Sequence, residues 1–593
     1  MLIAGIGAAP THAGGGPENV FVVVNTLSPA SLAVANAFIA LREVPPINVF
    51  ATAWEGPDDA VPIGVFRERI LGPVLAAIDA RGLAPQIDCI AYSCGFPWRI
   101  DFRDDLPEPR ADRDKYPAGS LTGMTFLFAA TLEPPVGSMP SWRSRRANGY
   151  APPPAADGRA TTTRGFRAAA GWGLDGEPTE TGGSHHVLAV MLGVTAGRGN
   201  SVAEICNSLA AATAADGSRP TGTIYFVRNA DVRSTTRSAG FESAAAAIRE
   251  VGARAEIITG TLPQQKADVA GLTTGTADFD WASSGSRLLP GAICDNLTSF
   301  GGVFTPEAGQ TPLAAFIRAG AAGASGTVIE PYALAEKFPA PALHVHYARG
   351  ACLAEAFYRS VRSPYQLLVV GDPLCQPWAR IPAVDVAITA DPQSRKPLDT
   401  ATPLAGTVAI LPRATPAGPA PIGRYELFVD GLRLATSRDG GPLPLDTRRL
   451  SDGYHELRVV AIESSPLETQ GRWIRGVMVA NHGHQLSLSG GADEVTTAET
   501  LTIHIAGTPA DAVTVFTAGR VLERRTPSGP AVATDITIPA AALGPGEVTL
   551  HATAFLENVA VANAMPITVR VTDQPSSPVT PQSRPPESGG PSR

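Results

Sequence analysis

The first part of the chain alternates between short apolar runs and amphipathic segments. Residues 18–25, 47–54 and 87–97 are rich in Val, Ile, Phe and Ala, as in strands that are buried on both faces of a sheet. Helical patterns fill the intervals between them, and the first begins at Ser28 followed by Pro29, an N-cap and first-turn pair. This order of strand, helix and strand predicts right-handed crossovers and a parallel sheet.

A second run of the same kind begins near residue 222. Its expected strands cover residues 222–231, 253–260, 291–296, 325–331 and 365–373, with helical patterns between them. We therefore predict two successive doubly wound α/β units, over residues 17–98 and 184–380. Residues 99–183 break the rhythm with mixed charges and prolines, which indicates a loop-rich insertion on the surface.

The period changes to strict alternation from about residue 383. Short strands follow one another with Asp-Gly turns and no long helices, as in Ig-like sandwiches. We expect two all-β Ig-like domains, over residues 383–483 and 484–573. Residues 574–593 are rich in Pro and Ser and predict a disordered tail.

Composition narrows the class of protein. The 593 residues are 44% hydrophobic and 17% charged, with a net charge of −8, which is typical of a globular chain. No basic tract with interleaved aromatics indicates a nucleic-acid partner, and no run of about 18 apolar residues indicates a membrane span. Residues 1–16 are apolar and small, with Thr11-His12-Ala13 resembling a cleavage site, so we expect the remnant of a secretory signal and a secreted or cell-surface protein. A periplasmic location and a frayed apolar terminus are the alternatives.

Cys294 is the candidate for chemistry in the second α/β run. It lies where an expected apolar strand gives way to polar residues, and α/β domains usually carry their chemistry at such strand ends. A nucleophilic cysteine needs an activating group, because a free thiol with a pKa near ~8.5 is mostly neutral at physiological pH. Asp295, its neighbour, would oppose a thiolate. The alternative is a small buried hydrophobe at the end of a strand.

The order of segments around Cys294 carries a family resemblance. An SSGS turn, the strand GAICDN, FGGVF, two helices and the strand LLVVGDP follow one another between residues 283 and 373. This order resembles the gingipain family of secreted cysteine endopeptidases, which implies a caspase-like fold with Cys294 as the nucleophile. An Ig-like module after the catalytic domain is also found in that family. More closely, residues 18–378 resemble an uncharacterised family of large secreted bacterial proteins with this gingipain-like half.

The resemblance also implies the partners of the nucleophile. The family's base is a His in a His-Gly pair at the end of the preceding strand, and we match that position to Ser284, which cannot serve as a base. His344 and His346 are the candidate replacements, or else are packed loop histidines. They also form an H-x-H pattern that could bind a metal with Glu330.

The remaining site residues complete the expected peptidase. Backbone N–H groups of Gly301 or Gly302 would hold the oxyanion, and Asp280 and Asp295 would form a pocket for basic side chains. No cofactor or metal is expected.

Two functions follow from these features. The first is a secreted modular protein with a gingipain-like cysteine-peptidase domain, degenerate or active on a protein or peptide substrate. The second is a non-catalytic extracellular binding or scaffold protein whose Ig-like domains engage a surface partner or polysaccharide. A Ser-His-Asp hydrolase has little support, because no GxSxG motif follows a strand.

Overall fold

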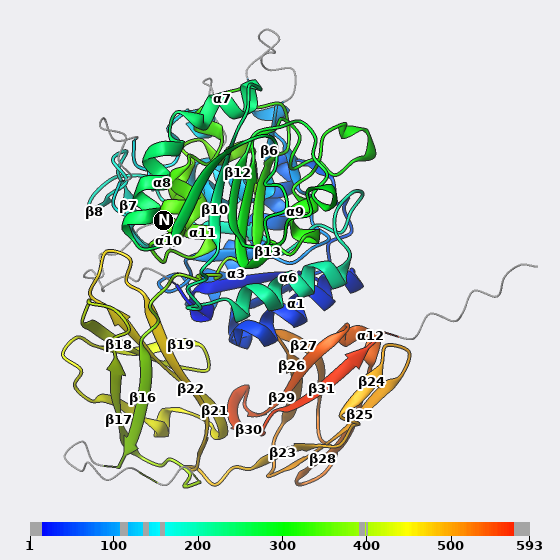
Figure 1. Ribbon diagram of the computed structural model, residues 1–593. Coiled ribbons are helices and arrows are strands. Elements are labelled where there is room, and N and C mark those ends of the chain that lie inside the picture. Colours follow the sequence, from blue (N-terminus) through cyan, green and yellow to red (C-terminus); the bar gives the residue numbers. More distant parts are fainter. Residues whose placement is uncertain are drawn as a thin grey trace, which may run out of the picture.

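The computed structural model describes residues 15–106, 117–133, 141–153, 161–390, 398 and 401–573. The predicted disordered tail and all but the last two residues of the predicted signal remnant lie outside these residues. An α/β domain stands above two β-sandwiches (Figure 1). The mixed α/β architecture followed by two all-β domains agrees with the sequence-based prediction.

In the described part of the chain, one ten-stranded sheet runs through the α/β domain. Its first half contains β1 (Val20–Asn25), β2 (Val49–Thr52), β4 (Cys89–Tyr92), β9 (Leu188–Met191) and β15 (Leu367–Gly371). Its second half contains β10 (Thr223–Arg228), β11 (Arg254–Thr259), β12 (Val269–Thr274), β13 (Leu288–Asn296) and β14 (Gly323–Thr327). The spatial order is β11-β10-β12-β13-β14-β15-β9-β4-β1-β2.

The two halves are parallel within themselves and antiparallel to each other. All pairings inside a half are parallel, and β14 pairs with β15 in the antiparallel sense. The expectation of two separate units is therefore corrected, because the two runs share one sheet. β9, which we placed in the second unit, pairs with β4. The β14–β15 pairing covers an edge that each half would otherwise expose.

Two groups of helices pack on this sheet. The first group consists of α1 (Pro29–Arg42), α6 (Val202–Ala214) and α9 (Ala314–Arg318), and the second of α8 (Phe241–Glu250), α10 (Ala342–Ala348) and α11 (Leu353–Ser360). α3 (Gly72–Ala80) precedes β4, and α7 (Val232–Ser238) follows β10. Ser28 is the N-cap of α1, as predicted, since its hydroxyl accepts a hydrogen bond from the Ser31 N–H.

The insertion between residues 99 and 183 is partly internal. It contains β5 (Arg99–Asp101), β6 (Ala118–Ser120), α4 (Leu121–Phe126) and α5 (Phe128–Leu132). All six residues of α4 are buried, and the helix packs against β9 and β15. The apolar run that forms α4 therefore completes the core over β9 and β15 of the first half instead of lying on the surface.

The two sandwiches are joined through a shared sheet. The first contains β16 (Ala383–Thr389), β17 (Thr407–Thr415), β18 (Ile422–Val429), β19 (Leu432–Ser437), β20 (Leu443–Asp446), β21 (Asp452–Glu463) and β22 (Gln470–Val479). The second contains β23 (Leu486–Ser489), β24 (Glu494–Thr496), β25 (Thr500–Gly507), β26 (Ala512–Thr517), β27 (Arg520–Arg525), β28 (Val532–Pro539), β29 (Gly546–Leu556), β30 (Val559–Asn563) and β31 (Ile567–Thr572). β21 pairs with β30 across the domains, at Gly453 and Asn563. A Cβ on Gly453 would lie 1.9 Å from the Asn563 carbonyl oxygen, so this junction requires glycine.

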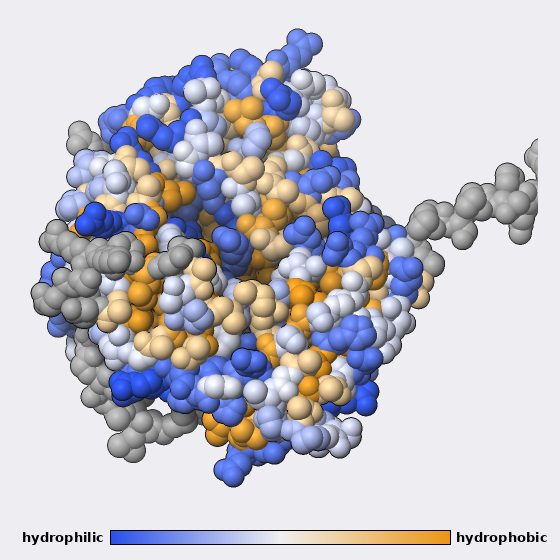
Figure 2. Space-filling view, turned by 90° about the horizontal axis from the view of Figure 1, so that it is seen from below, coloured by the Kyte–Doolittle hydropathy of each residue, from blue (hydrophilic) through white to orange (hydrophobic). Residues whose placement is uncertain are grey.

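Both sandwiches form hydrogen bonds with the first half of the α/β domain. Asn36 on α1 donates its amide to the carbonyls of Leu543, Gly544 and Pro545 in the second sandwich. Gln86 donates to the Gly431 carbonyl of the first sandwich at 2.7 Å. Viewed from the sandwich side, the surface mixes apolar and polar groups around a central hollow (Figure 2).

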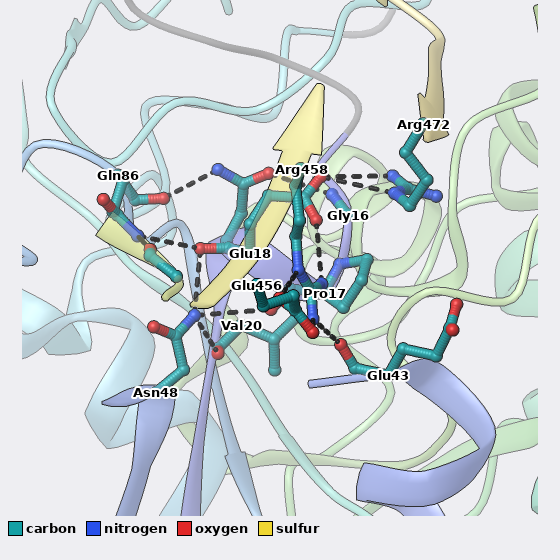
Figure 3. Close-up of polar contacts among 12 residues, drawn as sticks. Gly16, Pro17, Glu18, Val20, Glu43, Asn48, Gln86, Glu456, Arg458 and Arg472 are labelled. Carbon is teal, nitrogen blue, oxygen red and sulfur yellow. Dashed lines mark hydrogen bonds and ion pairs between the residues drawn. The ribbon is translucent and has the colours of Figure 1, made fainter. Parts of the chain in front are cut away.

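A buried ionic network adds to this interface. Glu18, just before β1, is 1% exposed and lies 3.6 Å from the guanidinium of Arg458, which is equally buried on β21. Arg472 on β22 approaches the other Glu18 oxygen to 3.4 Å (Figure 3). Because a buried charge is tolerated only when it is paired, this network fixes the first sandwich against the start of the sheet.

Candidate functional site

Cys294 lies inside β13, two residues before its end, and is fully buried. It pairs with Leu272 on β12 and Ala324 on β14. Burial raises the pKa of its thiol well above the ordinary value, and the neighbouring Asp295 raises it further. Both effects favour the neutral thiol, and the full burial of Cys294 agrees with a packing role.

His344 and His346 lie on helix α10, not on the loop that the sequence suggested. Residues two positions apart on a helix differ by about 200° around its axis, so the two imidazole rings point in different directions. His344 packs edge-on against Phe226, with ring centroids 5.7 Å apart, whereas His346 Nδ1 lies 2.9 Å from the Thr163 hydroxyl. Burial lowers the pKa of His344 to about 4 and that of His346 well below its usual range. Both rings are neutral near pH 7.

The pattern of strand pairing places Cys294 and His344 on opposite faces of the sheet. A Cβ on Gly271 would lie 2.9 Å from His344 Nδ1, so His344 covers the face to which residue 271 points. Gly271 pairs with Ile293, and the next residue, Leu272, pairs with Cys294. Since successive residues of a strand point to opposite faces, the sheet separates the thiol from this imidazole.

The H-x-H pattern also lacks the geometry of a metal site. Glu330 uses its carboxylate to accept a hydrogen bond from the Tyr332 N–H at 2.7 Å. Within the described ranges, no group of three or more His, Cys, Asp or Glu side chains is placed to hold a metal ion.

Ser284 lies at the wrong edge of the sheet for the predicted base position. It belongs to the turn η7 (Ala282–Ser284) before β13 begins, and its hydroxyl donates to the Trp281 carbonyl at 2.7 Å. The end of the preceding strand is Thr274, followed by Gly275. The match between Ser284 and a base at a strand end is therefore corrected, and neither Thr274 nor Gly275 can act as a base.

Gly301 and Gly302 serve close backbone packing. The Gly302 N–H donates to the Thr327 carbonyl at 3.0 Å, so it is not available to an oxyanion. A Cβ on Gly326 would lie 2.3 Å from the Gly301 carbonyl carbon. The glycines at these positions allow the loop after β13 to lie against β14.

Asp280 and Asp295 do not form a common pocket. Asp280 is exposed and accepts a hydrogen bond from the Ala282 N–H. Asp295 is 1% exposed and pairs with the guanidinium of Arg237 and the hydroxyl of Ser325. Arg237 also donates to the carbonyls of Thr274 and Pro339. The sequence analysis missed the ion pair between Arg237 and Asp295, although a charged residue inside an apolar strand indicates a buried partner.

The structure instead offers a large cavity between the α/β domain and the first sandwich. Its volume is about 890 Å³. Arginines line it from three segments of the α/β domain: Arg219 after α6, Arg349 after α10, and Arg380 in the connection to the sandwich. Glu250, at the end of α8, and Glu463, at the end of β21, are its acidic residues. We call it the interdomain cavity.

The polar groups of the interdomain cavity are incompletely partnered. Among the residues that the structure describes, none of the three guanidinium groups forms an ion pair with a carboxylate. Burial lowers the pKa of Arg349, and Glu250 opposes this shift. Glu463 is 5% exposed, and its Oε1 has no hydrogen-bond partner. Burial raises the pKa of Glu463, and Arg380 opposes this shift. Unpartnered buried polar groups around a cavity are typical of a ligand site.

A second cavity, of about 390 Å³, lies where all three domains meet. Arg81, Asp430 and His551 line it. Its groups are largely satisfied, because Arg81 donates to two carbonyls and Asp430 lies 2.6 Å from His455 Nδ1. It is the weaker candidate for a binding site.

Comparisons with known proteins give similarity without a family. No protein-family model and no curated protein matches this chain. A solved structure described as "Structure of Protease" aligns over 78% of this chain and 98% of its own, at 12% identity and a TM-score of 0.39. The fibronectin(III)-like modules of Clostridium thermocellum CbhA align over 32% of this chain and 95% of theirs, at 14% identity and a TM-score of 0.13. Dimeric latent PorU from Porphyromonas gingivalis aligns over 32% of this chain and 20% of its own, at 12% identity and a TM-score of 0.14.

None of the described helices is long and apolar enough to cross a membrane.

Proposed function

We propose that this protein is a secreted, modular binding protein whose α/β domain does not use Cys294 as a peptidase nucleophile. The observation that carries the proposal is the placement of Cys294 and His344 on opposite faces of the sheet. A cysteine peptidase needs its thiol and its base within hydrogen-bonding reach of each other and of the substrate. A sheet between the two groups prevents this contact.

The surroundings of Cys294 support the same proposal. Its exposed fraction is zero, and its pKa is raised by burial, so the fraction of thiolate at neutral pH is negligible. The expected oxyanion and substrate-pocket groups are engaged elsewhere, as the Gly302 N–H and the Asp295 carboxylate illustrate. The two sandwiches are joined to each other and to the α/β domain, which suits a rigid scaffold for binding.

Thiol labelling of the native full-length chain tests the proposal. We expect a thiol-reactive peptidyl probe to leave Cys294 unmodified, because the side chain is buried and neutral. Cys206 on α6 is the internal comparison, since it is partly exposed, and iodoacetamide should modify it well before Cys294. Mass spectrometry of tryptic peptides would measure both.

Peptide hydrolysis supplies the second readout. Wild type and Cys294→Ala should be equally inactive on a mixture of peptides with basic and apolar residues. Labelling or hydrolysis that is lost in Cys294→Ala would overturn the proposal and favour an active cysteine peptidase.

A further inference from the structure

We propose that the interdomain cavity binds an acidic oligosaccharide of the uronate type, a sugar chain that carries carboxylate groups. The inference deepens the proposed function, on which it rests, by naming the site and the class of ligand. Neither the cavity nor its arginines belongs to the region around Cys294. The site lies between domains, where small-molecule and saccharide sites are common, and its volume is within the usual range for them.

The charge of the cavity selects an anionic ligand. Arg219, Arg349 and Arg380 converge on it from three separate segments, against Glu250 and Glu463. In the described part of the chain none of these guanidinium groups has a carboxylate partner. Arg349 donates to the Thr161 carbonyl at 2.8 Å, whereas the guanidinium groups of Arg219 and Arg380 have donors available for a ligand. Arginine presents paired N–H donors that match the geometry of a carboxylate. A cleft between low-dielectric walls strengthens this attraction.

The acidic groups and hydroxyls of the cavity favour a saccharide over an acidic peptide. The buried Glu463 Oε1 requires a hydrogen-bond donor, which a sugar hydroxyl supplies and a carboxylate does not. Ser465 and Thr469 add further hydroxyls along the wall. A peptide with consecutive carboxylates would be repelled by Glu250 and Glu463, whereas a sugar chain separates its carboxylates with neutral hydroxyl groups.

Isothermal titration calorimetry on the full-length protein tests the proposal with three probes. These are tetragalacturonate, the neutral cellotetraose, and tetraglutamate as the acidic peptide. We expect tetragalacturonate to bind, cellotetraose not to bind, and tetraglutamate to bind at least about tenfold more weakly than tetragalacturonate. Raising the salt concentration from 50 to 500 mM should weaken the binding, since part of the affinity is electrostatic.

Substitutions locate the binding. Arg219→Gln and Arg380→Gln remove charge from exposed side chains, so the fold should persist, and each should weaken tetragalacturonate binding by about tenfold. Arg380→Lys should weaken it less, because it keeps the charge and loses the paired donors. Arg413→Gln is the matched control, since Arg413 is exposed on β17 of the same sandwich and does not line the cavity.

The outcomes that would overturn the proposal are distinct. Absence of tetragalacturonate binding, equal binding of cellotetraose, or stronger binding of tetraglutamate would each exclude an acidic oligosaccharide as the preferred ligand. Equal affinities of the Arg219, Arg380 and Arg413 variants would exclude the interdomain cavity as the site. None of these results bears on Cys294, whereas hydrolysis that depends on Cys294 would overturn the proposed function and leave the titration unchanged.

Discussion

In both halves of the central sheet, an asparagine at the end of the first strand joins the neighbouring loops. Asn25 closes β1 and Asn229 directly follows β10, and each uses its side-chain amide to join two neighbouring loops. The acceptors are the carbonyls of Trp54 and Gly95 in the first half, and of Gly260 and Gly275 in the second, at 3.0 to 3.1 Å. In both halves a serine of the next helix, Ser31 or Ser234, accepts the asparagine backbone N–H.

The repeated asparagine occupies a position at the strand ends that often carries chemistry in α/β domains. Each first strand ends at the point where the strand order reverses, which is the usual place for a ligand in an open α/β sheet. Here Asn25 and Asn229 fill that position and satisfy backbone groups. The halves differ in their surroundings, because side-chain hydrogen bonds from Asn36 and Gln86 join the first half to the two sandwiches.

The largest expected effect concerns one buried arginine in each half, which is paired with aspartate. Arg42 on α1 pairs with Asp372 and Asp216, and Arg237 on α7 pairs with Asp295. Removing one partner leaves a buried charge uncompensated, so Arg42→Met and Arg237→Met should each lower the free energy of unfolding by about 3–5 kcal/mol. We expect Arg42→Met to have the larger effect, because it leaves two carboxylates. Urea unfolding followed by tryptophan fluorescence measures both.

Exposed Arg413 is again the control for these variants. Arg413→Met should change stability by less than about 0.5 kcal/mol, as is usual for a surface side chain without a buried partner. If Arg237→Met were no more destabilising than Arg413→Met, the second half would not depend on its buried pair, and the comparison would fail.

A smaller effect is expected from the aspartates that precede the third strand of each half. Asp88 is buried before β4, and burial raises its pKa to about 8, with Glu355 adding to the shift and a hydrogen bond from Ala168 opposing it. Asp268 occupies the matching place before β12. Although partial burial acts the other way, hydrogen bonds from the hydroxyls of Thr223 and Tyr225 lower its pKa.

The two aspartates should therefore give opposite pH dependences. The stability associated with a protonated Asp88 is complete below about pH 4 and is lost as the pH rises towards 8, by roughly 3 kcal/mol between pH 5 and 8. Asp88→Asn should remove this loss. Asp268 stabilises above about pH 4, and its contribution is lost as the pH falls further, so Asp268→Asn should weaken only the acid side. Thermal midpoints from pH 3 to 9 would show both, and identical profiles for the two variants would contradict the assignment.

The sequence predicted the strands and helices of both halves better than it predicted how these elements pair and pack. Apolar runs located β1 and β10, and Ser28 located the start of α1, because these depend on local patterns. The partner of β9 and the helix around His344 depended on contacts distant in sequence. Whether Cys294 faces His344 depends on strand register, and a shift of one residue would reverse its face. The sequence therefore identified a candidate cysteine without showing that the sheet isolates it.

The smallest loss of stability is expected from substitution of Asn25 and Asn229. Asn25 is 4% exposed, so Asn25→Ala leaves two carbonyls without their donor in a region that water cannot reach, and should cost about 2–3 kcal/mol. Asn229 is only partly buried, so water can replace its amide, and Asn229→Ala should cost about 1 kcal/mol. Asn25→Asp separates the two roles of the side chain, because it keeps the acceptor for the Leu27 N–H and loses the donors. Urea unfolding of the three variants would decide the matter: equal losses for Asn25→Ala and Asn229→Ala would mean that the difference in burial does not distinguish the two asparagines.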